Sequence, residues 1–161
     1  MKTVIFIRHG KSSWDYDVSD KDRPLKERGI SDAYLIGAKL SSFDLAIDKA
    51  FSSPANRALH TAIIVLRELS FDFKNLDVSD ELYDFSGENV LQFLKGLNSS
   101  LDTVLVFGHN YAFTTLANTL GDSYIENLPT AGMVQINFKT NDWSKLGEGQ
   151  SKNIVFPKHL R

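Results

Sequence analysis

Two apolar runs that each end in a histidine constrain the fold of this 161-residue chain more than any other feature. Residues 4–7 form an unbroken apolar run rich in β-branched side chains, and Arg8-His9-Gly10 follows it directly. Residues 103–107 form a second such run, and Gly108-His109-Asn110 follows that one. Runs of this kind are typical of strands buried on both faces of a parallel sheet. Since the carboxyl ends of parallel strands meet at one edge of the sheet, where α/β folds bind ligands, we expect both histidines there.

Helical and strand patterns alternate along the rest of the chain. This alternation predicts an α/β fold, a three-layer α/β/α sandwich with a mostly parallel mixed sheet. Ser53, Ser86 and Asn110 each precede a helical pattern and are good candidates for the N-cap. We expect helices over residues 27–41, 54–69, 87–97 and 111–120, and further strands over residues 49–52, 76–79, 133–138 and 154–156.

Length and composition fit one ordinary globular domain over residues 1–161. The formal net charge is −2 and no block of like charges occurs, which argues against a nucleic-acid or membrane-surface binder. The chain has no cysteine, which excludes a thiol nucleophile and a cysteine-based zinc site. No apolar stretch is long enough for a signal peptide or a membrane span, so we expect a cytoplasmic protein. The oligomeric state is left open.

Arg57 adds a third part to the predicted site. It lies in the first turn of the helix that Ser53-Pro54 begins, and it is off the apolar stripe of that helix. This position places it at a helix N-terminus, on the rim where the strands end. We therefore expect Arg57 to meet Arg8 and the two histidines, although the four residues are far apart in the sequence.

The chemistry of this group favours phosphate. Two arginines can hold phosphate oxygens through paired N–H donors, and helix N-termini add backbone donors. A neutral imidazole can attack phosphorus, and a second, protonated imidazole can stabilise charge on the phosphoryl oxygens. No metal ion and no other cofactor is required. A single histidine after a strand is more often a residue that ties down a loop, but two in matching places favour a site.

Several ordered motifs resemble the histidine phosphatase superfamily, the phosphoglycerate-mutase-like group. Within that group the chain is similar to the short branch of SixA-type phosphohistidine phosphatases. Arg-His-Gly alone is a weak signal, whereas five motifs in order over residues 1–120 are a strong one. The motifs are Arg8-His9-Gly10-Lys11-Ser12-Ser13-Trp14, Asp22-Arg23-Pro24-Leu25, Ser52-Ser53-Pro54 with Arg57-Ala58 and Thr61-Ala62, Glu81-Leu82-Tyr83, and Gly108-His109-Asn110.

The resemblance implies a role for each residue of the predicted site. His9 is the nucleophile that becomes phosphohistidine. Arg8, Arg57 and His109 form the phosphate pocket, and Glu81 donates a proton to the leaving group.

Three residues of the motifs carry weaker expectations. Ser12 is a further candidate for substrate binding. Many relatives have asparagine where this chain has Asp15, and an ionised Asp15 would repel phosphate, so we do not count it as a ligand. Glu81 has an alternative reading, a solvated residue in an acidic loop beside Asp80 and Asp84.

The resemblance and the residues together predict a metal-independent phosphatase. The expected partner is a phosphorylated substrate, for example a protein domain that carries phosphohistidine. No long insertion is available between residues 62 and 109 to close the site, which suits hydrolysis better than a mutase reaction. The alternatives are a phosphatase or mutase for a small phosphorylated metabolite, and a non-catalytic phosphate-binding module.

Overall fold

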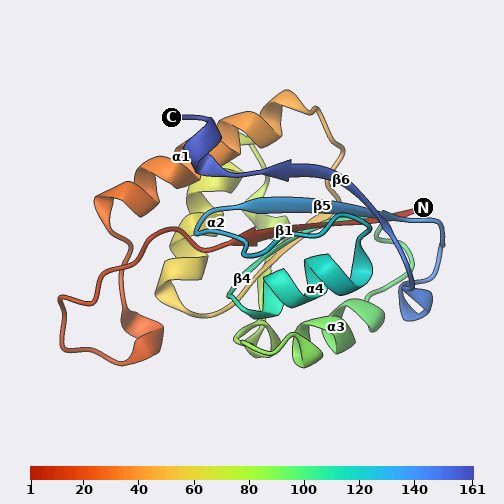
Figure 1. The fold of residues 1–161 in the computed structure, drawn as a ribbon, viewed down its shortest axis with the longest axis horizontal. Helices are drawn as coiled ribbons and strands as arrows, with labels where there is room; N and C mark the ends of the chain where they lie inside the picture. Colours follow the sequence, from red (N-terminus) through yellow and green to blue (C-terminus); the bar gives the residue numbers. More distant parts are fainter.

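A six-stranded mixed sheet lies at the centre of the computed structural model, which describes residues 1–161 (Figure 1). In spatial order its strands are β3 (Leu76–Val78), β2 (Lys49–Ser52), β4 (Thr103–Gly108), β1 (Lys2–Arg8), β5 (Met133–Phe138) and β6 (Gln150–Val155). The first four of these run parallel, whereas β5 pairs antiparallel with β1 and β6 pairs antiparallel with β5. The predicted mostly parallel mixed sheet is therefore confirmed.

Four helices cover the two faces of the sheet, α1 (Glu27–Ser42) and α2 (Asn56–Glu68) on one and α3 (Glu88–Lys95) and α4 (Ala112–Leu120) on the other (Figure 1). Alternate side chains of β1 supply both cores. Val4 and Phe6 pack with α3 and α4, whereas Ile5 and Ile7 pack with α1 and α2. All four side chains are fully buried, and burying each contributes about 1.5–3 kcal/mol. β1 is therefore the centre of the three-layer sandwich.

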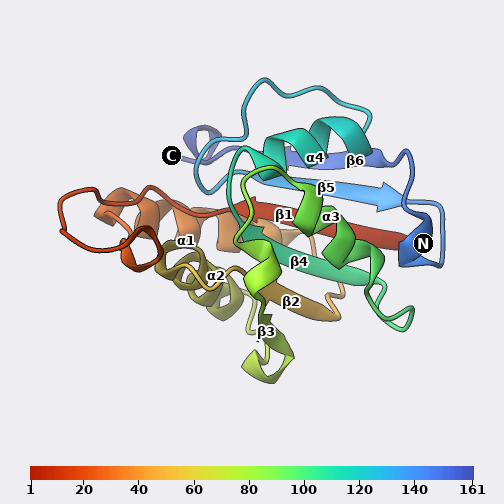
Figure 2. The ribbon, with the colours of Figure 1, turned by 90° about the horizontal axis from the view of Figure 1, so that it is seen from below.

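The segment between β1 and α1 extends beyond the carboxyl end of β1 (Figure 2). A bridge between Ser12 and Leu25 closes its base, and the short 3-10 helix η1 (Asp20–Asp22) lies near its far end. Four more 3-10 helices complete the chain, η2 (Phe73–Asn75), η3 (Asp80–Leu82), η4 (Trp143–Lys145) and η5 (Pro157–His159). None of the helices is long and apolar enough to cross a membrane.

The start of α2 differs from the prediction. α2 begins at Asn56, and Ser53 makes no cap for it, because its hydroxyl accepts from Ala55 N and contacts His109 instead. Arg57 lies in the first turn of α2, as predicted, and only 3% of it is exposed. On α1, Ile36 is buried in the core whereas Tyr34 is 45% exposed.

The predicted caps of α3 and α4 have different outcomes. Asp84, not Ser86, supplies most of the cap of α3, because its carboxylate accepts from the backbone N–H groups of Ser86, Gly87, Asn89 and Val90. Asp84 is accordingly buried rather than solvated. The N-cap residue of α4 is Tyr111, one residue after the predicted Asn110, although the side-chain oxygen of Asn110 still accepts from Thr114 N in the first turn.

The carboxyl-terminal strands also differ from expectation. β6 has six residues and pairs antiparallel along β5, where the sequence predicts only a short strand over residues 154–156.

Candidate active site

The register between β1 and β4 brings the two strand-end histidines together. Arg8 pairs with Gly108, and His9 N donates to Gly108 O over 3.0 Å. The chain therefore leaves both strands at the same level, and the ring centroids of His9 and His109 lie 5.4 Å apart. Both side chains are buried, with 7% of His9 and 1% of His109 exposed.

Arg57 reaches both histidines from the first turn of α2. Its Nε lies 3.4 Å from Nε2 of His9, and its Nη2 lies 3.5 Å from Nδ1 of His109. Thr61, one turn further along α2, fixes this arrangement. Its hydroxyl donates to Arg57 O and accepts from Gly10 N, which ties α2 to the loop that carries His9.

Hydrogen-bond partners assign a tautomer to each histidine. Nδ1 of His9 lies 2.6 Å from Gly10 O, and because a carbonyl can only accept, Nδ1 carries the proton. The lone pair of His9 Nε2 therefore faces Arg57. In His109, Nε2 lies 2.8 Å from the hydroxyl oxygen of Ser53, and Nδ1 faces the Arg57 guanidinium, which can only donate. The proton of neutral His109 is therefore on Nε2.

Burial lowers the pKa of both imidazoles far below the ordinary value of 6.5. The pKa of His9 falls to about 3, because burial disfavours the cation and the charges of His109, Arg57 and Arg8 add to this effect. The pKa of His109 also falls to about 3, through burial and the neighbouring Arg57. A neutral His9 agrees with the sequence prediction. The predicted protonated His109 does not hold for the free protein.

Arg8 completes the cationic side of the group. Its Nη1 donates to Leu128 O over 2.8 Å, and its buried Nε has no hydrogen-bond partner. A buried donor without an acceptor costs about 1–3 kcal/mol, which an anion's oxygen would recover. Burial and the nearby charge of Arg57 lower the pKa of Arg8, and the closeness of these two cations favours an anion between them.

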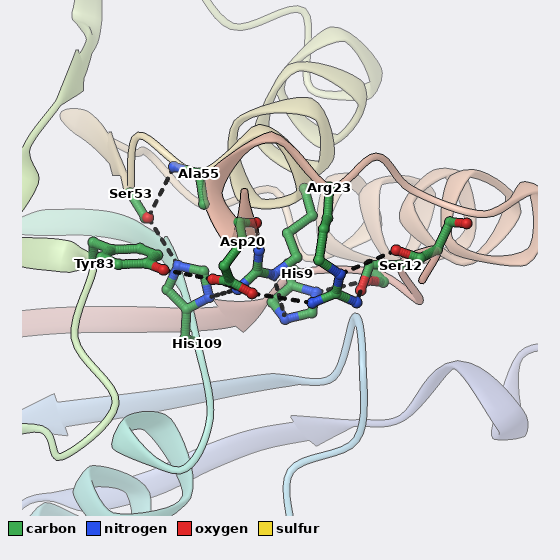
Figure 3. A network of polar contacts seen from close by, with 11 residues as sticks. His9, Ser12, Asp20, Arg23, Ser53, Ala55, Tyr83 and His109 are labelled. Carbon is green, nitrogen blue, oxygen red and sulfur yellow. Dashed lines mark hydrogen bonds and ion pairs between the residues drawn. The ribbon is translucent and has the colours of Figure 1, made fainter. Parts of the chain in front are cut away.

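Asp20 and Tyr83, which the sequence reasoning did not select, join the same network (Figure 3). Asp20 Oδ2 accepts from Arg57 Nη2 over 2.9 Å and from the Tyr83 hydroxyl, and Asp20 O accepts from Arg57 Nη1 over 2.6 Å. Burial raises the pKa of Asp20, but the hydrogen bonds from Tyr83 and Arg57 outweigh it and lower the pKa to about 2. In the sequence Asp20 is one of four aspartates between residues 15 and 22, and nothing in the pattern distinguishes it from the others. The adjacent motif Asp22-Arg23-Pro24 is the only signal that this segment belongs to the site.

Arg23 fixes the segment that carries Asp20. Its guanidinium donates to Ser12 Oγ, to Ser13 O and, over 3.3 Å, to Asp20 Oδ1. It also stacks 3.2 Å from the ring centroid of Trp14, whose side chain is 75% exposed. The hydroxyl oxygen of Ser12, predicted to bind substrate, therefore already accepts a hydrogen bond of 2.6 Å from Arg23 Nη2.

Glu81 stands apart from this group. It lies in η3, is exposed to solvent, and makes no side-chain hydrogen bond or ion pair. Its predicted role as proton donor stays a prediction.

No group of three or more histidine, aspartate or glutamate side chains is arranged to hold a metal ion. The largest cavity, about 580 Å³, is lined by residues such as Met1 and Gln150 and lies at the opposite end of β1 from His9. The two-histidine, two-arginine cluster is therefore the site that the fold builds at the carboxyl ends of β1 and β4.

Fold and site together define an α/β protein with a buried, cationic, two-histidine centre, and a family comparison gives the class a name. Residues 4–89, more than half of the chain, match the protein family described as the histidine phosphatase superfamily (branch 1). The chain belongs to this superfamily, as its motifs predict. The matched part includes His9, Arg57 and Glu81, and it ends before His109.

Individual relatives agree with this assignment. The chain is 35% identical to a 2,3-bisphosphoglycerate-dependent phosphoglycerate mutase of Bradyrhizobium sp. (strain BTAi1 / ATCC BAA-1182), over 55% of this chain and 46% of the mutase. The match thus spans about half the length of that relative. An uncharacterized protein of Mycobacterium tuberculosis (strain CDC 1551 / Oshkosh) is 28% identical over 93% of this chain and 98% of its own. Among solved structures, the protein histidine phosphatase SixA complexed with tungstate matches 99% of both chains with a TM-score of 0.83 and 26% identity.

Proposed function

We propose that this protein is a phosphatase that passes a phosphoryl group from its substrate to His9 and then to water. The observation that carries the proposal is the placement of Arg57, whose Nε and Nη2 point at Nε2 of His9 and Nδ1 of His109. A phosphoryl group that replaced these two contacts would meet the nucleophile, a guanidinium fork and a second imidazole at once. The likeness of this chain to SixA complexed with tungstate, an oxyanion, also supports a phosphate site.

The first step uses the tautomer of His9. The lone pair of Nε2 attacks phosphorus while the bond from phosphorus to the leaving group breaks. Arg8 and Arg57 hold the phosphoryl oxygens and supply positive charge, so the chemistry needs no metal ion. His109 becomes protonated on Nδ1 when the anion arrives, because a nearby dianion raises its pKa, and it then donates to a phosphoryl oxygen.

The proposed substrate is a phosphohistidine on a protein. Aromatic rings pack against His109, since the ring centroid of Phe85 lies 4.9 Å from that of His109 and the centroid of Tyr83 lies 5.3 Å from it, and Phe85 is 45% exposed. Such surfaces suit a flat imidazole leaving group on a macromolecule. Only η2 and β3 lie between α2 and η3, so no long insertion is available to exclude water.

Labelling tests the covalent step. The wild-type protein, mixed with 32P-labelled phosphohistidine protein and quenched with alkali, is expected to carry an alkali-stable, acid-labile phosphoryl group. His9→Ala is expected to carry none and to lose turnover, whereas the matched control His60→Ala, on the same α2 as Arg57, is expected to label normally. A wild type that never labels, or turnover by His9→Ala, would contradict the proposal and favour a non-catalytic phosphate-binding module.

A small phosphorylated metabolite is the second candidate substrate, either for hydrolysis or for a mutase reaction. The 35% identity to a phosphoglycerate mutase over 96 residues favours it. A panel of phosphorylated metabolites assayed beside phosphohistidine protein separates the two candidates. A kcat/KM for one metabolite well above that for the protein substrate would overturn the protein-substrate proposal, and isomerised product in place of phosphate would identify a mutase.

Glu81 is proposed as the proton donor for leaving groups poorer than imidazole. Glu81→Gln is then expected to slow the release of an alkoxide from an alkyl phosphate, with little effect on 4-nitrophenyl phosphate, whose leaving group needs no proton. Equal effects on both substrates would contradict this role for Glu81.

A further inference from the structure

We infer that Asp20 is the general base that activates water for the hydrolysis of phosphorylated His9. This inference rests on the proposed function, because it concerns the second half of the same reaction. It adds a residue that the family motifs of the sequence did not select, on a different loop from Glu81.

Asp20 is the one carboxylate that enters the polar network of the site. Its Oδ2 lies 2.9 Å from Arg57 Nη2, the same nitrogen that lies 3.5 Å from His109 Nδ1. A phosphoryl group held by Arg57 would therefore contact the same guanidinium that binds the carboxylate of Asp20. Asp84 is also buried, but its oxygens are taken by the N-terminus of α3, and Glu81 is exposed and outside the network.

The hydrogen bonds of Asp20 leave one of its oxygens free for water. Oδ2 accepts from both Arg57 and Tyr83, which uses its two lone pairs. Oδ1 accepts only from Arg23 Nη1, over 3.3 Å, and 41% of the side chain is exposed. A water molecule from solvent can therefore reach Oδ1 while Oδ2 stays fixed.

The loop around Asp20 holds the carboxylate in place. Arg57 Nη1 donates to Asp20 O, and Arg23 anchors the loop through Ser12 and Ser13. A base held from three sides in this way loses little freedom when it acts, which is the condition for efficient proton transfer.

The charge state of Asp20 suits a base better than an acid. With its pKa lowered to about 2, the carboxylate is ionised at neutral pH in the free protein. In the proposed step, the water oxygen forms a bond to phosphorus as the bond from phosphorus to His9 Nε2 breaks. The water proton goes to Asp20 Oδ1, and phosphate leaves with His9 neutral again. Asp20 then returns its proton to solvent.

Burst kinetics with 4-nitrophenyl phosphate test the inference, because this leaving group departs without a proton and isolates the second step. Asp20→Asn is expected to lower steady-state turnover about 100-fold, the size of a general-base contribution, and to change the burst rate by less than about tenfold. Phosphorylated His9 then accumulates in the variant. The matched control Asp22→Asn, on the same η1 and with a side chain that bonds only Ser19, is expected to behave as wild type.

Rescue of an Asp20 variant by added formate is a second measurement, and a purely structural role of Asp20 would not produce it. Asp20→Ala is expected to regain dephosphorylation, and not phosphorylation, when formate is added. Equal losses in both steps, or turnover of Asp20→Asn at the wild-type rate, would overturn the inference even where wild-type His9 labels. If no variant and no wild type ever carries phosphate on His9, the proposed function itself has failed.

Discussion

Nε of Arg57 lies 3.4 Å from Nε2 of His9, and both side chains are almost fully buried. The contact joins the end of β1 to the first turn of α2, two elements that are 48 residues apart. A cation directed at the lone pair of an imidazole keeps that imidazole neutral. The other guanidinium nitrogens of Arg57 bond Asp20 and His109, which fixes the arginine in place. The nucleophile and its anion clamp are thus preorganised before substrate arrives.

This preorganisation makes the shape of Arg57 as important as its charge. Arg57→Lys keeps the charge but loses the fork that spans His9, His109 and Asp20, so we expect kcat/KM to fall about 100- to 1000-fold. The measurement is phosphatase kinetics on the folded variant. A loss of less than about threefold would mean that a point charge suffices.

The buried histidines predict an early loss of stability in acid. The unfolded chain protonates both histidines near pH 6.5, whereas the folded protein keeps them neutral down to about pH 3. In this window the unfolded state binds more protons, so the free energy of unfolding falls as pH falls. Between pH 7 and pH 5 each histidine is expected to remove about 2 kcal/mol.

Urea unfolding at a series of pH values measures this loss. His109→Asn is expected to remove about half of the pH dependence between pH 7 and pH 5. Aspartates such as Asp20, with its pKa lowered to about 2, act in the same direction only below their ordinary 3.8, so they do not obscure this window. A free energy of unfolding that stays flat from pH 7 to pH 5 would contradict the lowered histidine pKa values.

Gly29 is predicted to control the position of His9 from outside the site. A Cβ at Gly29 would lie 2.2 Å from Lys11 O and 2.7 Å from Lys11 N, so the loop after His9 would have to move. We expect Gly29→Ala to destabilise the protein by about 1–3 kcal/mol and to lower kcat as well. Gly147→Ala is the matched control, because no atom lies within 4 Å of its Cβ, and it is expected to change neither.

The cap of α3 gives a prediction about stability alone. Asp84→Ala removes the acceptor of four backbone N–H groups and is expected to cost about 1–2 kcal/mol in thermal or urea unfolding. Ser86→Ala loses one contact of 3.3 Å from Glu88 N and one to Asp84, and is expected to cost less. The reverse ranking would restore Ser86 as the principal cap.

The sequence alone determined the parts of this protein that depend on local pattern. The runs at residues 4–7 and 103–107 predict two buried parallel strands, and the strands place His9 and His109 at one edge of the sheet. The ordered motifs predict the superfamily, which the family match over residues 4–89 confirms. Helices and strands follow from periodicity, although α2 begins two residues later than its Ser-Pro signal predicts.

Only the tertiary structure decided what surrounds His9. Asp20, Thr61 and Tyr83 carry no periodic or capping signal for their roles, and they meet Gly10 and Arg57 only because the 11–26 loop, α2 and η3 fold against the end of β1. Burial in turn lowers the pKa of His109 to about 3, so His109 is neutral in the free protein, whereas its predicted role needs a protonated imidazole. Desolvation and through-space contacts depend on which distant segments pack together, and the residues along the chain do not reveal them until the sheet is assembled.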